Sequence, residues 1–227
     1  EPRFKNRVTR PIVHWGIQGP QRTGPIAHPG KYTFRVTVDG TVYTQPFTIM
    51  KDPAIASNAS DLVLSTRAQA RIRDNIDTTV AVINRLEIMR KQIEDLVKSD
   101  SVAADLKAAL KDFDKKALDV ELKLLTKSDL HSDDKWYVEQ YKVYLNLLWL
   151  AGEVGTGASD VAGGAEYKPT DASMGVLAEI ERDLGVARVA FAALIDKELP
   201  AFNKAMAGRL PPISDKLPPV KPAVILP

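Results

Sequence analysis

The strongest constraint on the fold is a helical repeat of apolar residues that fills the middle of the chain. Between Ser60 and Lys98 these residues recur at steps of three, four or seven, which places them on one face of a helix. An unbroken helix over this stretch would be about 55–60 Å long at 1.5 Å per residue. We expect Ser60 or Asp61 to cap its start. The repeat consists of Leu64, Ala68, Ile72, Ile76, Ile83, Leu86, Ile93 and Val97.

Three further amphipathic stripes follow the first one. The second runs over 102–124, the third is an aromatic stripe over 136–154, and the fourth runs over 174–194. Pro200 interrupts the continuation of the fourth stripe, so we expect a kink or a new short helix there. Helices that each have one apolar face and short links bury those faces by packing together. We therefore predict an antiparallel up-down four-helix bundle over residues 60–207.

Residues 1–53 have the composition of β-structure instead. Apolar and polar residues alternate from Tyr32 to Val38, which is the period of a half-buried strand. Asp39-Gly40 accepts the positive φ angles of a tight turn, and the chain returns through Thr41 to Ile49. A lone hairpin is marginal in water, so its sheet needs further cover. Arg3 to Trp15 could supply one or two more strands.

The hairpin and the phrases after it resemble one family. Residues 29–53, PGKYTFRVTVDGTVYTQPFTIMKDP, resemble the closing hairpin of the immunoglobulin-like module in bacterial secreted BNR-repeat proteins, which carry a sialidase- or sortilin-type propeller. In those proteins a helical C-terminal segment follows at once. The stretches YKVYLNLLWLAGEV, KPTDASMGVLAEI and KELPAFNKAM look like that segment and occur in the same order, so the resemblance covers about residues 25–207.

The resemblance implies an α+β chain and an exported location. The fold class is then a small antiparallel Ig-like sheet, the four-helix bundle and an extended tail, in three regions: 1–53, 60–207 and 208–227. The propeller, which would hold any glycosidase-like site, is absent from these residues. Residues 1–21 are also too short to complete a sandwich of about 100 residues. The missing cover must come from the bundle, from the tail or from another chain.

The last region, 208–227, is proline-rich and cannot form a helix. It also carries many apolar residues, which favours docking, either along the chain's own helices or on a partner. A mobile terminus is the alternative. The residues predicted to bind a partner are Leu210, Pro211, Pro212, Ile213, Leu217, Pro218, Pro219, Val220 and Ile225.

No motif for catalysis, nucleotide binding or metal binding stands out in the sequence. His131 has three aspartates close by, at 129, 133 and 134, but an interhelical loop and helix cap explain this segment better than a metal site. The aromatic group around Tyr144 could form a carbohydrate or cofactor surface, although its helical spacing favours core packing. We therefore assign no catalytic, cofactor-binding or metal-ligating residue and expect no cofactor.

Bulk composition limits the classes of partner. The 31 basic and 29 acidic residues are interspersed, so no nucleic-acid footprint is indicated. Cysteine is absent, which excludes disulfides and thiolate chemistry. The apolar run around 143–151 is far shorter than the roughly 20 residues of a membrane span, so we expect no transmembrane segment. The start at Glu1 is compatible with a removed leader, a cut precursor or a partial sequence.

Two functional hypotheses remain open. The first is a non-catalytic exported scaffold or accessory subunit, periplasmic or in the cell envelope. It would bind other protein subunits, for example those of a membrane-bound energy-converting complex. The second is the C-terminal, non-catalytic part of a BNR-repeat glycosidase-like protein whose propeller lies elsewhere. An enzyme that acts with only these residues has no candidate site in the sequence.

Overall fold

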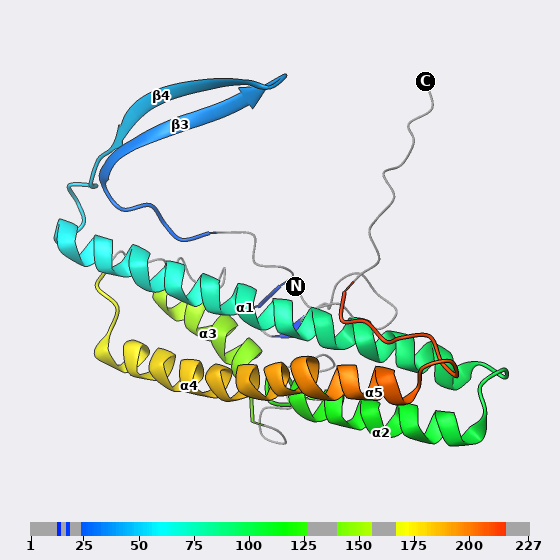
Figure 1. Cartoon of the computed structure of the whole chain (residues 1–227). Coiled ribbons are helices and arrows are strands. Elements are labelled where there is room, and N and C mark those ends of the chain that lie inside the picture. Colours follow the sequence, from blue (N-terminus) through cyan, green and yellow to red (C-terminus); the bar gives the residue numbers. More distant parts are fainter. Residues whose placement is uncertain (1–12, 15–16, 19–23, 127–139, 156–166, 217–227) are drawn as a thin grey trace.

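The computed structural model describes residues 13–14, 17–18, 24–126, 140–155 and 167–216. It confirms a mixed α+β chain, in which an antiparallel hairpin precedes a set of packed helices (Figure 1). Strands β3 (Gly30–Val38) and β4 (Thr41–Ile49) form the hairpin. Among the described residues, no helix is long and apolar enough to cross a membrane.

Helix α1, Ala59–Lys98, is 40 residues long and spans the whole helical part (Figure 1). Its predicted extent is confirmed, but the predicted cap is wrong. The side chain of Asn58 caps the helix, because its Oδ1 accepts a hydrogen bond of 2.9 Å from the backbone N–H of Asp61. Ser60 lies inside the first turn and donates its hydroxyl to the same Asn58 oxygen at 2.5 Å. Asn is as good a capping residue as Ser, and it stands one residue before the helix begins.

Helices α2 (Ala104–Glu121) and α3 (Val143–Val154) follow one another along α1. Glu121, at the C-terminal end of α2, pairs with Arg90 in the C-terminal half of α1. The backbone N–H of Tyr144 then donates to Leu124 O at 3.1 Å, so α3 starts where α2 has ended. From there α3 runs to Gly155, which lies beside Gln69 near the start of α1. The two short helices therefore cover successive halves of the long one (Figure 1).

The third helix begins later than predicted. Residues 140–142 precede it without helical structure, while the earlier part of the predicted stripe, including Trp136 and Tyr137, lies outside the described residues. Tyr144 is buried, and Tyr141 and Trp149 are partly buried against the core. The core-packing interpretation of the aromatic stripe is thus confirmed for these three described residues.

Helix α4, Asp171–Ala193, continues through a π-helical turn η2, Leu194–Glu198, into α5, Leu199–Ala205. Pro200 stands in the first turn of α5, directly after the π-helical turn, so the regular α-helix is interrupted before the proline while the helical path continues. This line of helices runs in the same direction as α1. Glu181 contacts Arg71 near the start of α1, and Phe191 lies under Arg85 farther along.

The arrangement differs from the predicted up-down bundle, in which four helices of similar length alternate in direction. In an up-down bundle α3 would run parallel to α1, whereas here α2 and α3 both run against it. Three lines of helix result: α1, the pair α2 and α3, and α4 with η2 and α5. The physical reason is length, because helices of 18 and 12 residues can cover a helix of 40 residues only in succession.

One apolar core runs between these three lines. It contains a buried charged cluster, in which Arg90 pairs with Asp114 at 2.9 Å and with Glu121. Burial lowers the pKa of Arg90, but the carboxylates of Glu121 and Asp114 outweigh burial and raise it overall. The fully buried large side chains are Ile72, Ile83, Leu86, Met89, Ile93, Leu110, Leu124, Leu125, Leu147, Leu177 and Leu194.

The described part of the predicted extra-strand region does not extend the hairpin. Val13–His14 (β1) and Ile17–Gln18 (β2) pair with each other in a separate two-stranded sheet. Residues 1–12, which include most of the predicted strand region, lie outside the described residues. Among the described strands, β3 and β4 therefore have only each other as neighbours.

Candidate interaction surfaces

The β3–β4 hairpin, called the ribbon below, has one apolar and one polar face. Its register pairs Val36 with Tyr43 and Tyr32 with Phe47, and directly paired side chains share a face. The opposite face carries Lys31, Arg35 and several threonines, together with Val42 and Pro46. The apolar residues of the first face, called the apolar face below, are Tyr32, Phe34, Val36, Val38, Tyr43 and Phe47; the uncharged Thr41 and Gln45 lie beside them.

Most of the apolar face is open to solvent. Phe34 and Tyr43 are each 60% exposed, and Phe47 is 45% exposed although it stacks on Tyr32 with ring centroids 5.8 Å apart. Scattered surface apolar residues need no explanation, but a contiguous patch of aromatic and β-branched side chains marks an interaction surface. The ribbon leaves the helical part near the N-terminal end of α1 and stands apart from the packed helices (Figure 1).

The two edges of the ribbon differ. Asp39 and Gly40 both have positive φ, at 47° and 79°, as in the two-residue turn that pairs Val38 with Thr41. Because hydrogen-bonded and non-bonded pairs alternate from this closing pair, Thr33 and Pro46 form a non-bonded pair whose main-chain groups point outward. Pro46 has no N–H to offer, so the β4 edge is interrupted. The β3 edge keeps all its donors and can accept another strand.

The root of the ribbon is fixed to α1 by side chains. Gln69 Oε1 accepts the backbone N–H of Ile26 at 2.9 Å, and the hydroxyl of Thr66 donates to Ile26 O at 2.7 Å. Both main-chain groups of one extended residue are thereby satisfied by one face of the helix. The carbonyl of His28, which precedes a bend at Pro29, accepts the Tyr32 hydroxyl at 2.6 Å.

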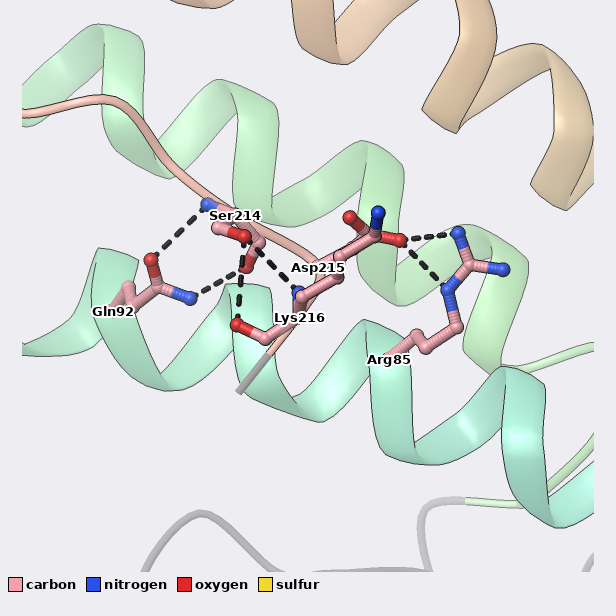
Figure 2. A network of polar contacts seen from close by, with 5 residues as sticks. All are labelled: Arg85, Gln92, Ser214, Asp215 and Lys216. Carbon is pink, nitrogen blue, oxygen red and sulfur yellow. Dashed lines mark hydrogen bonds and ion pairs between the residues drawn. The ribbon is translucent and has the colours of Figure 1, made fainter. Parts of the chain in front are cut away.

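The root of the tail is held in the same manner near the other end of α1. Asn203 of α5 accepts the N–H of Ile213 and donates to its carbonyl, both at 2.9 Å. Gln92 of α1 accepts the N–H of Ser214 at 3.1 Å and donates to its carbonyl at 2.6 Å (Figure 2). Two side-chain amides thus bind the main chain of two consecutive extended residues.

Side chains of the same segment are also bound. Ile213 is only 3% exposed and belongs to the apolar core. Asp215 is 8% exposed and accepts from Arg85 Nε at 2.7 Å, as Figure 2 shows. Arg85 is itself placed over the Phe191 ring, with its guanidinium carbon 4.7 Å from the ring centroid. Arg85 and Gln92 are seven residues apart, so they lie on one face of α1.

The predicted partner-binding residues fall into two groups. Leu210 and Ile213 pack against the chain's own helices, and Pro211 and Pro212 between them are exposed. The structure therefore places the start of the tail in cis. Leu217, Pro218, Pro219, Val220 and Ile225 lie outside the described residues, so their partner-binding role stays a prediction. The main contributors that the sequence did not reveal are Gln92, Asn203 and Arg85.

A hollow of about 200 Å³ lies between α1 and the start of α4. Arg67, Arg71 and Lys168 line it, with Asp171 opposite. Arg71 is committed to Glu181, which accepts two hydrogen bonds from its guanidinium. The hydrogen bond from Arg71 lowers the pKa of Glu181, and the bond from Asn75, at 2.8 Å, adds to this effect. The positive charge around the hollow is thus partly neutralised.

Within the described part of the chain, no group of three or more His, Cys, Asp or Glu side chains could hold a metal ion. The His131 segment, with its aspartates at 129, 133 and 134, lies outside that part. No protein-family model matches this sequence, and no curated protein or solved structure is significantly similar to it. The functional argument therefore depends on the surfaces described above.

Proposed function

We propose that this chain is a non-catalytic scaffold that binds another protein through the apolar face of the ribbon. The single observation that carries the proposal is the exposure of Phe34, Tyr43 and Phe47 on one face of a two-stranded sheet. A two-stranded ribbon is marginally stable by itself. Burial of such a face against a second β-sheet would stabilise the ribbon and the complex together.

The chemistry of the covering partner follows from the surface. The apolar face contains no charged residue, so it suits an apolar sheet face rather than an acidic or basic patch. The uninterrupted β3 edge would add a partner strand by main-chain hydrogen bonds. Together these features support the proposal of an incomplete sandwich of the immunoglobulin-like kind, in which the partner supplies the missing strands. The helices, which pack as one bundle-like body, would serve as the rigid support.

The proposed setting is an exported one, in the periplasm or cell envelope, as part of a larger assembly such as a membrane-bound energy-converting complex. The support for this setting is the resemblance of residues 29–53 to modules of secreted proteins. The chain would contribute contacts and spacing to the assembly, with no transmembrane segment of its own.

A second candidate function has a specific observation in its favour. The order of hairpin, Asp52-Pro53 and helices is that of the C-terminal region of BNR-repeat proteins, and the ribbon is an open sheet of the type such a region would close. In this alternative the covering strands belong to an upstream part of the same polypeptide. The chain would then be the non-catalytic end of a glycosidase-like protein.

Site-specific photocrosslinking in the producing organism tests both candidates. A benzophenone amino acid replaces Phe34 on the apolar face, and in a matched control it replaces Thr44 on the polar face. We expect a discrete adduct from position 34 and at least tenfold less from position 44. The mass of the adduct and its peptides show whether the covering sheet is another subunit or the same polypeptide.

Equal crosslinking from the two positions would contradict the proposal, because a face-specific partner cannot contact both sides of the ribbon equally. A chain that crosslinks from neither position and remains monomeric at its natural concentration would contradict it as well. In that case the exposed face has no occupant and the scaffold function is wrong.

A further inference from the structure

The segment after α5 is bound through main-chain hydrogen bonds to side chains, which the packing of its apolar side chain does not require. Ile213 and Ser214 each have both main-chain groups paired with one side-chain amide, from Asn203 and Gln92 respectively. Recognition of an extended main chain by fixed hydrogen-bonding groups, with side-chain pockets for selectivity, is how peptide-binding grooves work. The pocket that takes Ile213 and the Arg85 guanidinium that takes Asp215 provide that selectivity here.

We propose that the groove between α1 and α5 is a peptide-binding site for an apolar–polar–acidic tripeptide whose first two residues present their main-chain groups to side-chain amides. Its ligand in this structure is the chain's own Ile213–Ser214–Asp215, which fills the site in cis. The groove is distinct from the apolar face of the ribbon. A ligand of the groove must offer one apolar side chain, the main-chain N–H and C=O groups of two residues, and one carboxylate.

The side chains that form the groove are held in position by contacts that do not involve the ligand. Gln92 Nε2 also donates to Ile88 O at 2.9 Å, which fixes the direction of its amide. Arg85 stays over the Phe191 ring of α4. Phe202 beside Asn203 stacks on Phe113 of α2 with ring centroids 4.6 Å apart, which anchors α5. A site whose side chains are ordered by their own helices loses little entropy when it binds a peptide.

The link from α5 to the ligand explains why the site is occupied in cis. Gly208, with φ of 77°, turns the chain back after α5, and Pro211-Pro212 then set an extended entry. A short tether gives an intramolecular ligand an effective concentration in the millimolar range. A peptide in trans therefore binds only when the native segment has been released.

The test uses the full chain with its tail segment released by Ile213→Ser and Asp215→Lys. The probe is a fluorescein-labelled, end-blocked peptide with the sequence of residues 210–216, LPPISDK. By fluorescence anisotropy we expect it to bind the released chain at least tenfold more tightly than the unaltered chain. The matched control Lys216→Ser changes an exposed side chain only, and it should leave the groove filled and the peptide unbound.

A charge reversal makes the result specific to the groove. Arg85→Glu in the released chain should weaken the peptide at least tenfold and favour a peptide in which Lys replaces the aspartate. Should the released chain lose its helical circular dichroism, Ser214→Pro takes its place. It removes the N–H that donates to Gln92 and the hydroxyl that bonds to Lys216, and it leaves the side chains of Ile213 and Asp215 unchanged. Peptide binding that is no tighter to a released chain than to the unaltered one, or that ignores Arg85→Glu, overturns the proposal.

Discussion

Among the charged residues of the helical core, Arg90 is the one whose loss should destabilise the chain most. Its side chain is 12% exposed and pairs with Asp114 and with Glu121, which is itself buried. Arg90→Met would leave these carboxylates without their cation, and breaking a buried ion pair in this way costs about 3–5 kcal/mol. We expect that loss in the free energy of unfolding, measured by urea denaturation. Lys91→Met is the control, because solvent screens the exposed Lys91–Asp95 pair and its loss should change the free energy of unfolding far less.

Glu181 gives the stability of the chain a defined dependence on pH. Its pKa is lowered by the hydrogen bond from Arg71, so its contribution is complete above the pKa of an unfolded glutamate, about 4.3. The contribution is lost as the pH falls through the lowered pKa of the folded state. Glu181→Gln should therefore reduce the free energy of unfolding by up to about 1 kcal/mol at pH 7 and by progressively less in acid.

Thermal unfolding of Glu181→Gln at pH 7 and pH 3 measures this difference. The exposed Glu179→Gln variant should show a smaller change at pH 7. A deficit in Glu181→Gln that grows as the pH falls would contradict the assigned pairing, since it has the opposite sign.

At the scale of elements, the turn of the ribbon is the most sensitive point of the β-structure. Gly40 has a φ of 79°, which side chains disfavour, so Gly40→Ala should destabilise the ribbon by about 1 kcal/mol. We expect amide exchange in β3 to become about fivefold faster while the melting temperature of the helices stays unchanged, because the ribbon can open separately. Gly24→Ala is the matched control, since no atom lies within 4 Å of its added methyl group and its φ is not left-handed. A lowered helical melting temperature in Gly40→Ala would show that ribbon and helices unfold together.

The sequence predicted which helices and strands form, but it did not predict how they are arranged. The apolar repeat from Leu64 to Val97 predicted α1 to within one residue of its start, and Asp39-Gly40 predicted the turn. The tandem placement of α2 and α3 depends on which faces meet, and a periodic pattern is equally compatible with either order. The clue was length, because the second and third helices are each much shorter than α1.

The candidate site was only half predictable for a related reason. Apolar residues in a proline-rich tail indicated docking, and Ile213 does dock. Each residue that binds this segment does so through one side-chain amide. Asn203 lies 10 positions from Ile213, and Gln92 lies 122 positions from Ser214. One Gln or Asn on a helix has no periodicity or motif, so its role emerges only when the fold brings it to an extended segment.

At the scale of the whole molecule, α1 connects the two surfaces. Gln69 holds the root of the ribbon and Gln92 holds the root of the tail, about 35 Å apart at 1.5 Å per residue. Among the described strands, β3 and β4 pair only with each other and their apolar face is largely exposed, whereas the tail root is bound by α1 and α5. The two surfaces should therefore differ in their freedom to move relative to the helices.

Spin-label distances measure that freedom directly, because the chain has no cysteine and introduced labels are unique. The pair Thr37→Cys and Lys204→Cys joins the ribbon near its tip to α5, and the control pair Asp77→Cys and Lys204→Cys lies wholly within the helices. We expect the first distance distribution to be at least twice as broad as the second in the isolated chain. It should narrow to the width of the control when the apolar face is covered in the native assembly. If the ribbon's distance distribution is already as narrow as that of the control in the isolated chain, the orientation of the ribbon is set within the chain. Cover from a partner would then be unnecessary.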